Sequence, residues 1–148
     1  MTRPDYFVYF EAGFLHTENY GVGAFIITDG VAGEEVSCDT VVSHSSNSIR
    51  IFIECAIEAL RNIPHGASVH FITDLTYMVN IINHEWFIRA NQDLWGKFEN
   101  IARNGKHKCT AEWRAAKSKD VLLQRCWTEC SRKAGFNFVE YFENNPRK

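Results

Sequence analysis

The sequence predicts an α/β fold, a five-stranded mixed sheet flanked by helices. The first observation is the order of elements, three strands, a helix, a strand, two helices, a strand and a helix, inferred from residue periodicity. The second is composition, because 45% hydrophobic and 23% charged residues are typical of a globular chain and exclude disorder for most of it. The third is length, because 148 residues suit one domain with one core.

An antiparallel meander is expected at the start of the chain. Its three strands are rich in β-branched and aromatic residues and are expected at residues 6–11, 22–28 and 35–42. Asp29-Gly30 and Gly33 supply turn residues between the second and third strands. We therefore expect these strands to pair in sequence order.

A helix is expected next, over residues 49–62. Asn47 and Ser48 offer side chains that can cap its first turn, and its apolar residues recur at helical spacing. Pro64 and Gly66 then stop it.

Strands and helices alternate in the rest of the chain. The strands are expected at residues 67–73 and 108–114, and the helices at 75–89, 92–104 and 120–134. With right-handed crossovers, both strands lie parallel to the first strand. The fold class is therefore a sheet whose first three strands are antiparallel and whose last two are parallel to the first.

The positive charge is concentrated late in the chain. Residues 103–133 hold nine Lys and Arg against three Asp and Glu, whereas residues 1–102 hold five against 13. Such an excess attracts phosphate groups, although a charged stretch can also be a solvated face. Nucleic acid is therefore an expected partner.

The sequence shows no membrane or export signal. No apolar run approaches the ~18 residues that cross a bilayer, and the first ten residues lack the pattern of a secretory signal. The five cysteines contain no Cys-x-x-Cys pair, so they indicate neither a disulfide framework nor a zinc ribbon. We expect an intracellular protein, in the cytoplasm or nucleus, that does not bind membranes.

Several short segments together resemble the type 1 ribonuclease H family over about residues 6–135. The matching segments, in chain order, are Tyr9-Phe10-Glu11-Ala12-Gly13, Gly21-Val22-Gly23-Ala24, the helix segment from Arg50 to Leu60, Thr73-Asp74-Leu75-Thr76-Tyr77, Asn91-Gln92-Asp93-Leu94-Trp95, Glu112-Trp113 and Arg125-Cys126. The resemblance implies an RNase H-like domain over residues 1–135, followed by an aromatic C-terminal extension at 136–148.

In that family, four carboxylates hold two magnesium ions that cleave the RNA strand of an RNA/DNA hybrid. The resemblance places two of these positions on Glu11 and Asp74, and the other two on Phe52 and Trp127, which cannot bind a metal. It therefore implies a degenerate site with at most one weakly held Mg²⁺ at Glu11 and Asp74, and no other cofactor. Both acids can equally be ordinary polar strand-end residues near helix N-termini.

One alternative alignment slides the helix by two residues and puts Glu54 at the ligand position. Glu54 shares a helix face with Arg50, Glu58 and Arg61, away from the apolar stripe, so we expect it to be exposed.

The resemblance also indicates residues that would contact nucleic acid. Asn47 and Ser48 lie near the family's nucleic-acid-binding turn, and Arg114, Lys117 and Lys119 add positive charge after the last strand. Lys117 stands where the family carries a histidine that assists proton transfer, and a charged lysine is a poor general base at neutral pH.

Three functions remain open. The first is a catalytically inactive domain, a pseudonuclease, that binds RNA or an RNA/DNA hybrid without cleaving it. The second is a protein-interaction or assembly domain, favoured by the four aromatic residues in 136–142, which must pack on the domain or engage a protein partner. The third is a weak magnesium-dependent hybrid endonuclease. The ligand losses favour a protein that is not an enzyme.

Overall fold

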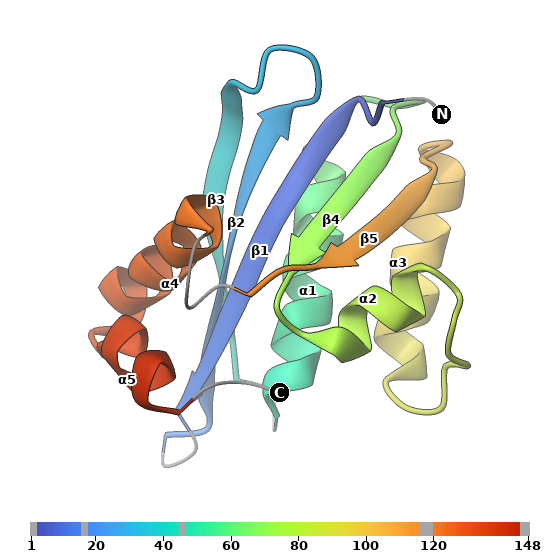
Figure 1. The fold of residues 1–148 in the computed structure, drawn as a ribbon. Coiled ribbons are helices and arrows are strands. Elements are labelled where there is room, and N and C mark those ends of the chain that lie inside the picture. The colour runs from blue at the N-terminus through green and yellow to red at the C-terminus, as the bar shows by residue number, and fades with distance from the viewer. Residues whose placement is uncertain (1–2, 16–17, 45–46, 116–119, 146–148) are drawn as a thin grey trace.

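The computed structural model describes residues 3–15, 18–44, 47–115 and 120–145, and the side chains of residues 142 and 143 are not described. It contains one five-stranded sheet in the order β3-β2-β1-β4-β5 (Figure 1). β1 pairs antiparallel with β2 and parallel with β4, β2 pairs antiparallel with β3, and β4 pairs parallel with β5. The predicted mixed sheet is confirmed. Its strands are β1 (Tyr6–Leu15), β2 (Tyr20–Asp29), β3 (Glu35–Ser43), β4 (Val69–Thr73) and β5 (Cys109–Trp113).

Helices cover the two faces of the sheet unequally. They are α1 (Ser48–Arg61), α2 (Thr76–Ile82), α3 (Gln92–Asn104), α4 (Val121–Ala134) and α5 (Phe138–Asn144). On one face α1 packs on β1, β2 and β3, α2 packs on β4 and β5, and α3 packs on α1. On the other face α4 packs on β1 and β2 and on the margin of β3 (Figure 1). Two buried apolar clusters result, one on each side of the sheet.

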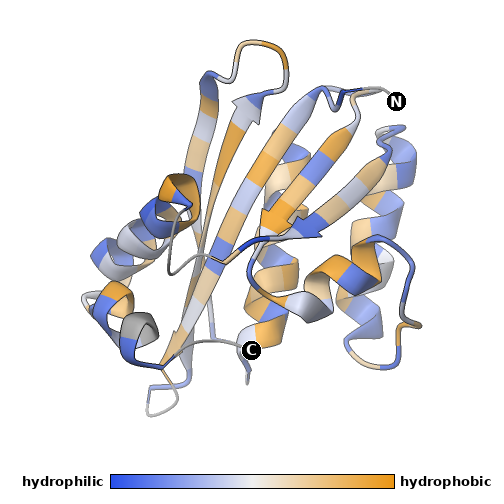
Figure 2. Cartoon of the chain, in the orientation of Figure 1, coloured by the Kyte–Doolittle hydropathy of each residue, from blue (hydrophilic) through white to orange (hydrophobic). Residues whose placement is uncertain are grey.

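Alternation along the strands produces these two clusters. Val8 and Phe10 of β1 enter the cluster under α1, whereas Phe7 and Tyr9 pack toward α4. The central strands accordingly contain many hydrophobic residues in Figure 2.

The first strand is longer than its predicted range of 6–11. β1 continues to Leu15 because residues 12–15 keep pairing with the start of β2, from Ala12 opposite Gly23 to Leu15 opposite Tyr20. Glu11 therefore lies in the middle of a strand and not at its end, a correction to the sequence reading. Gly21 permits this pairing under α1, since a Cβ there would lie 1.5 Å from the Ile51 side chain.

The second helix is shorter than its predicted range of 75–89. α2 ends at Ile82, and the Asn83 side chain turns to the outer strand, where it exchanges two hydrogen bonds with the backbone of Ala111, at 2.9 and 2.8 Å. His84 follows in the left-handed region, with φ 59°. The helix thus ends where the side-chain amide of Asn83 pairs with the backbone of β5.

The C-terminal extension contains a helix that the sequence reading did not predict. Asn137 caps α5 by accepting a hydrogen bond from the Glu140 backbone N–H at 3.0 Å. Phe138 is 2% exposed and packs on Gly13 of β1, where a Cβ would come within 2.4 Å of its ring. Phe136 and Tyr141 remain 38% and 47% exposed. The extension therefore packs on the domain through Phe138 and still presents aromatic surface.

Among the described residues, no helix combines the length and the hydropathy that a membrane span requires.

Candidate functional site

Glu11 is a fully buried carboxylate on the α4 side of the sheet. It is 0% exposed, and both of its oxygens accept hydrogen bonds from neutral donors. Oε1 accepts from the indole Nε1–H of Trp127 at 3.1 Å, and Oε2 accepts from the backbone N–H of Asp74 at 3.1 Å and from the Thr73 hydroxyl at 3.4 Å. Hydrogen bonds of this kind offset the desolvation of a buried carboxylate.

Asp74 follows β4 directly and adjoins Glu11 through its backbone. Its backbone N–H donates to Glu11, and its carbonyl accepts a 2.8 Å hydrogen bond from Trp113 Nε1. The residue is 6% exposed. The two acids thus come from adjacent parallel strands, whose register pairs Tyr9 with Ile72.

Phe52 and Trp127 are both core residues, on opposite sides of the sheet. Trp127, 2% exposed, belongs to the cluster under α4. Phe52, 1% exposed, belongs to the cluster under α1 and meets Phe10 edge to face at a centroid distance of 6.1 Å. The resemblance indicates four positions. Hydrogen bonds join Glu11 to Asp74 and to Trp127, whereas Phe52 lies in the cluster on the other side of the sheet.

Glu54 differs from its predicted exposure. The residue is half-buried, and its Oε2 atom is buried with no hydrogen-bond partner among the described residues. The physical reason is that α3 packs against α1, so part of the polar face of α1 is covered. Glu54 lies about 200° around the helix from Phe52, so the two side chains cannot share one site.

The donor set does not fit a pair of magnesium ions. Mg²⁺ is held by carboxylates in near-octahedral oxygen coordination, and two ions need enough negative charge to offset their repulsion. Within residues 3–15, 18–44, 47–115 and 120–145, no three His, Cys, Asp or Glu residues form a group that could hold a metal ion. A metal at Glu11 would also displace the hydrogen bonds that this buried carboxylate already accepts.

The residues predicted to bind nucleic acid fall in different environments. Asn47 is exposed and caps α1, because its Oδ1 accepts from the Arg50 N–H at 3.0 Å, and Ser48 is the first residue of that helix. Lys117 and Lys119 lie outside the described residues. The structure therefore shows a structural role for Asn47 that does not depend on a ligand.

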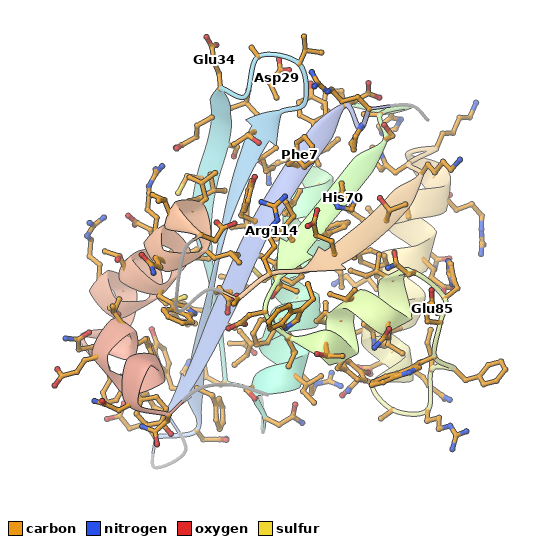
Figure 3. All side chains as sticks on the ribbon, in the orientation of Figure 1. Phe7, Asp29, Glu34, His70, Glu85 and Arg114 are labelled. Carbon is orange, nitrogen blue, oxygen red and sulfur yellow. The ribbon has the colours of Figure 1, made fainter. Side chains whose placement is uncertain are left out.

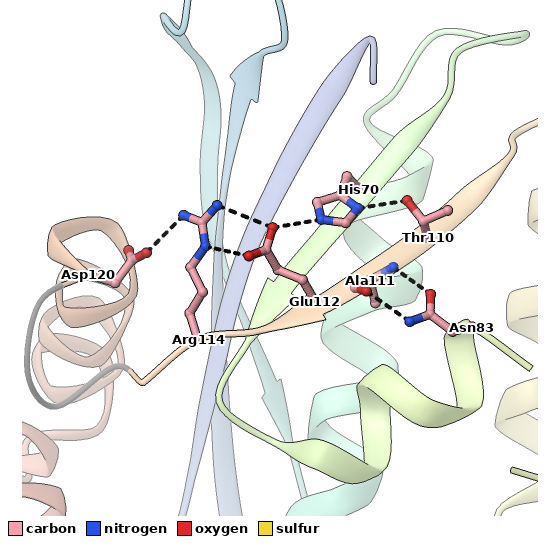
Figure 4. Close-up of polar contacts among 7 residues, drawn as sticks. All are labelled: His70, Asn83, Thr110, Ala111, Glu112, Arg114 and Asp120. Carbon is pink, nitrogen blue, oxygen red and sulfur yellow. Dashed lines mark hydrogen bonds and ion pairs between the residues drawn. The ribbon is translucent and has the colours of Figure 1, made fainter. Parts of the chain in front are cut away.

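Arg114 is held between two carboxylates. Its Nε and Nη2 donate to Glu112 at 2.9 and 3.2 Å, and its Nη1 donates to Asp120 at 3.2 Å (Figure 4). These hydrogen bonds, above all the one to Glu112, raise the pKa of Arg114. Asp120 in turn caps α4 through the N–H groups of Leu122 and Leu123. Any phosphate that reached Arg114 would compete with both acids.

His70 continues this row of polar contacts on the same face of the sheet, at a position for which the sequence analysis predicted no role. Nε2 of His70 lies 2.9 Å from Glu112 Oε1, and Nδ1 lies 2.7 Å from Thr110 Oγ1 (Figure 4). A carboxylate only accepts, so Nε2–H donates to Glu112 and, in the neutral ring, Nδ1 accepts from the Thr110 hydroxyl. The pKa of Glu112 is lowered, first by Arg114 and then by His70. The sequence did contain a signal for this group: Thr110, Glu112 and Arg114 are two residues apart, so side chains at this spacing along a strand lie on the same face of the sheet.

Ion pairs neutralise part of the basic stretch 103–133. Arg125 pairs with Glu35, whose pKa it lowers, and Arg132 pairs with Glu129 at 2.7 Å. The exposed basic residues of this stretch without an ion pair among the described residues are Arg103, Lys106, Lys108 and Lys133. The local excess of positive charge is therefore smaller than the residue count indicates.

Comparison with known proteins identifies the fold. No protein-family model matches the sequence, and no curated protein matches it either. Among solved structures, the chain is similar to the crystal structure of LC9-RNase H1, described as a type 1 RNase H with the type 2 active-site motif. The TM-score is 0.71 at 19% sequence identity, and the match covers 96% of this chain and 82% of that chain. The chain therefore has an RNase H-like fold.

Proposed function

We propose that this protein is a pseudonuclease, an RNase H-like domain that binds RNA or an RNA/DNA hybrid without cleaving it. The observation that carries the loss of activity is the environment of Glu11, a fully buried carboxylate that accepts a hydrogen bond from the Trp127 indole. In this proposal, that indole occupies a ligand position. A tryptophan there supplies no charge and fills space that a second ion would need.

The fold similarity and the exposed cations support nucleic-acid binding. LC9-RNase H1 is a ribonuclease H by description, and this chain has an exposed basic turn, made of Arg103 at the end of α3 and Lys106 and Lys108 in the connection to β5. Exposed cations bind phosphates by displacing condensed counterions, which makes affinity depend on salt. The residual acids Glu11 and Asp74 hold at most one weak Mg²⁺ in this proposal.

A cleavage assay tests the inactive site. Incubated with a labelled RNA/DNA hybrid and millimolar Mg²⁺ or Mn²⁺, the protein is expected to release no product above the buffer control, because only two carboxylates are available for two ions. An active ribonuclease H measured in parallel validates the substrate. Magnesium-dependent cleavage that Asp74→Asn abolishes would refute the pseudonuclease proposal and support the weak endonuclease.

A titration against salt tests the binding. Fluorescence anisotropy with single-stranded RNA, single-stranded DNA and the hybrid is expected to show affinity that falls as salt rises, with a log–log slope of about −2 to −3, since three cations form the turn. Affinity that does not change with salt, or no binding to any probe, contradicts the proposal.

A protein-interaction function is the second candidate, and exposed aromatic side chains favour it. Trp86 and Phe87, in the loop between α2 and α3, are 50% and 85% exposed, and Phe136 and Tyr141 of the extension are partly exposed. Exposed aromatic groups of this kind are typical of protein interfaces. Retention of a defined partner by the wild type, lost in Phe87→Ser and unchanged by salt, would favour this function over nucleic-acid binding.

A further inference from the structure

Half of one sheet face is covered by none of the helices in the described part of the chain. α4 packs on β1, β2 and the margin of β3, so the same side of β4 and β5 is left open (Figure 1). A groove of about 770 Å³ lies there, lined by Pro4, Phe7, Ser68, Val69, His70, Lys108, Thr110 and Glu112. Figure 3 shows Phe7, His70 and Arg114 on this face, next to one another across β1, β4 and the end of β5. A groove of this size is in the range of small-ligand sites, ~300–1,000 Å³.

The centre of the groove presents two flat rings. Phe7 and His70 meet edge to face, with centroids 5.8 Å apart and planes at 89°. His70 is held in place by Thr110 and Glu112, so its ring orientation is set by the protein. Aromatic side chains on an open sheet face are stacking platforms for unpaired nucleic-acid bases.

One end of the groove is basic. Lys108 lines the groove and is exposed, and Lys106 lies two residues before it, whereas Arg103 lines a separate pocket between α2 and α3. The backbone of this turn is held by hydrogen bonds from His107 N–H to Ala102 O at 2.8 Å and from Gly66 N–H to Gly105 O at 2.7 Å. The backbone from which Lys106 and Lys108 project is therefore held in place.

The acidic groups near the groove are already neutralised or hydrogen-bonded. Glu112, at the other end, accepts from Arg114 and His70, and Asp5 accepts from the Ser68 backbone N–H at 2.9 Å. A polyanion that entered from the end at Lys108 would therefore meet this cation first, and Glu112 lies at the other end of the groove.

We infer that this groove binds a short single-stranded segment of nucleic acid, with a base against Phe7 and His70 and the adjoining phosphates at Lys108 and the basic turn. The inference rests on the proposed nucleic-acid binding. It adds where the nucleic acid binds, in the groove, and that the bound segment is single-stranded. The groove lies toward the amino ends of β4 and β5, whereas Asp74 follows the carboxyl end of β4 (Figure 1). A duplex cannot use these rings, because its bases are stacked on one another.

Direct binding measurements with matched variants test the inference. Anisotropy would be recorded with labelled oligouridylate, oligothymidylate and a duplex of the same length. Lys108→Glu is expected to weaken single-strand binding about tenfold, since it removes one phosphate contact and adds repulsion. Phe7→Leu keeps an apolar side chain and removes the ring, with an expected loss of about fivefold to tenfold. Lys97→Glu, the same charge change on the exposed surface of α3, is the control and should stay within about twofold.

The outcomes separate this inference from the proposed function. Nucleic-acid binding that Lys108→Glu and Lys97→Glu reduce equally, or tighter binding of the duplex than of either single strand, overturns the groove and leaves the function standing. No binding to any probe overturns both. Should Phe7→Leu fail to fold by circular dichroism, photo-crosslinking of the wild type to oligouridylate decides: a crosslinked peptide containing Phe7 or His70 supports the groove, and crosslinks confined to other peptides overturn it.

Discussion

Glu11 is a buried carboxylate that neutral donors stabilise. Its donors are the Trp127 indole, the Asp74 backbone and the Thr73 hydroxyl, which come from α4 and from the end of β4. These two elements thus supply part of the solvation that water would otherwise give. Glu11, which the resemblance aligns with a catalytic acid, is thus buried and hydrogen-bonded in this structure.

Removing one of these donors should destabilise the fold. Trp127→Phe keeps an aromatic ring and removes the N–H that Glu11 Oε1 accepts, so we expect the free energy of unfolding to fall by about 1–3 kcal/mol. Urea denaturation measures the change.

Trp113→Phe is the matched control, because it also removes an indole hydrogen bond, to the Asp74 carbonyl at 2.8 Å. Its side chain is 49% exposed, so water can replace the donor, and the expected loss is below about 1 kcal/mol. Equal losses in the two variants would contradict the role assigned to the buried carboxylate.

At the scale of elements, an ion pair joins α1 to the start of α3. Arg50 donates through both terminal nitrogens to Asp93, at 3.1 and 2.7 Å, and to Asn91 at 3.2 Å. Asn91 has a left-handed backbone, with φ 57°, where the loop turns into α3. The ion pair therefore links the first turn of α3 to α1, although Arg50 and Asp93 are 43 residues apart in the sequence.

This pair predicts a pH dependence. The hydrogen bond from Arg50 lowers the pKa of Asp93 to about 2, below the ~3.9 of an unfolded chain. The contribution of the pair to stability is therefore complete above about pH 4 and is lost as the pH falls toward 2. In Arg50→Gln, NMR titration should show the pKa of Asp93 returning toward its ordinary value.

Asp93→Asn provides the control for that titration. Its stability should depend less steeply on pH between about 4 and 2 than that of the wild type, because the titrating group is gone. The assignment to Arg50 fails if the Asp93 pKa is unchanged in Arg50→Gln.

At the scale of the whole molecule, the C-terminal helix closes one side of the core. α5 packs on α4, and Phe138 fills the space over Gly13 at the far end of β1. Phe138 of α5 thus belongs to the apolar cluster under α4, against which Phe7 and Tyr9 of β1 also pack. A short aromatic segment is in this way part of the folded unit.

Phe138→Ala should therefore destabilise the whole protein. Truncation of a buried phenylalanine leaves a cavity and costs about 3–5 kcal/mol in the free energy of unfolding. Phe136→Ala, in a side chain 38% exposed, should cost clearly less, since water reaches the site already. Urea denaturation of both variants measures the difference, and similar losses would show that Phe138 does not complete the core.

Local sequence patterns were sufficient for the sheet and most of the helices. Strand alternation and right-handed crossovers predicted the directions of the strands, and helical periodicity placed the last helix at residues 120–134, close to the observed Val121–Ala134. The end of α2 was wrong, because Asn83 leaves the helix to pair with Ala111, a residue 28 positions away. Periodicity carries no information on such a distant partner.

The sequence alone determined the order of the elements and a mixed sheet whose last two strands run parallel to the first, because these follow from the periodicity of apolar residues and from right-handed crossovers. Only the tertiary structure decided what the charged groups do: Glu11 is buried under Trp127, Arg114 lies between Glu112 and Asp120, and the His70 face is left open beside α4. The physical reason is that apolar burial depends mainly on local alternation, whereas the state of a polar side chain depends on the partners that distant segments bring to it.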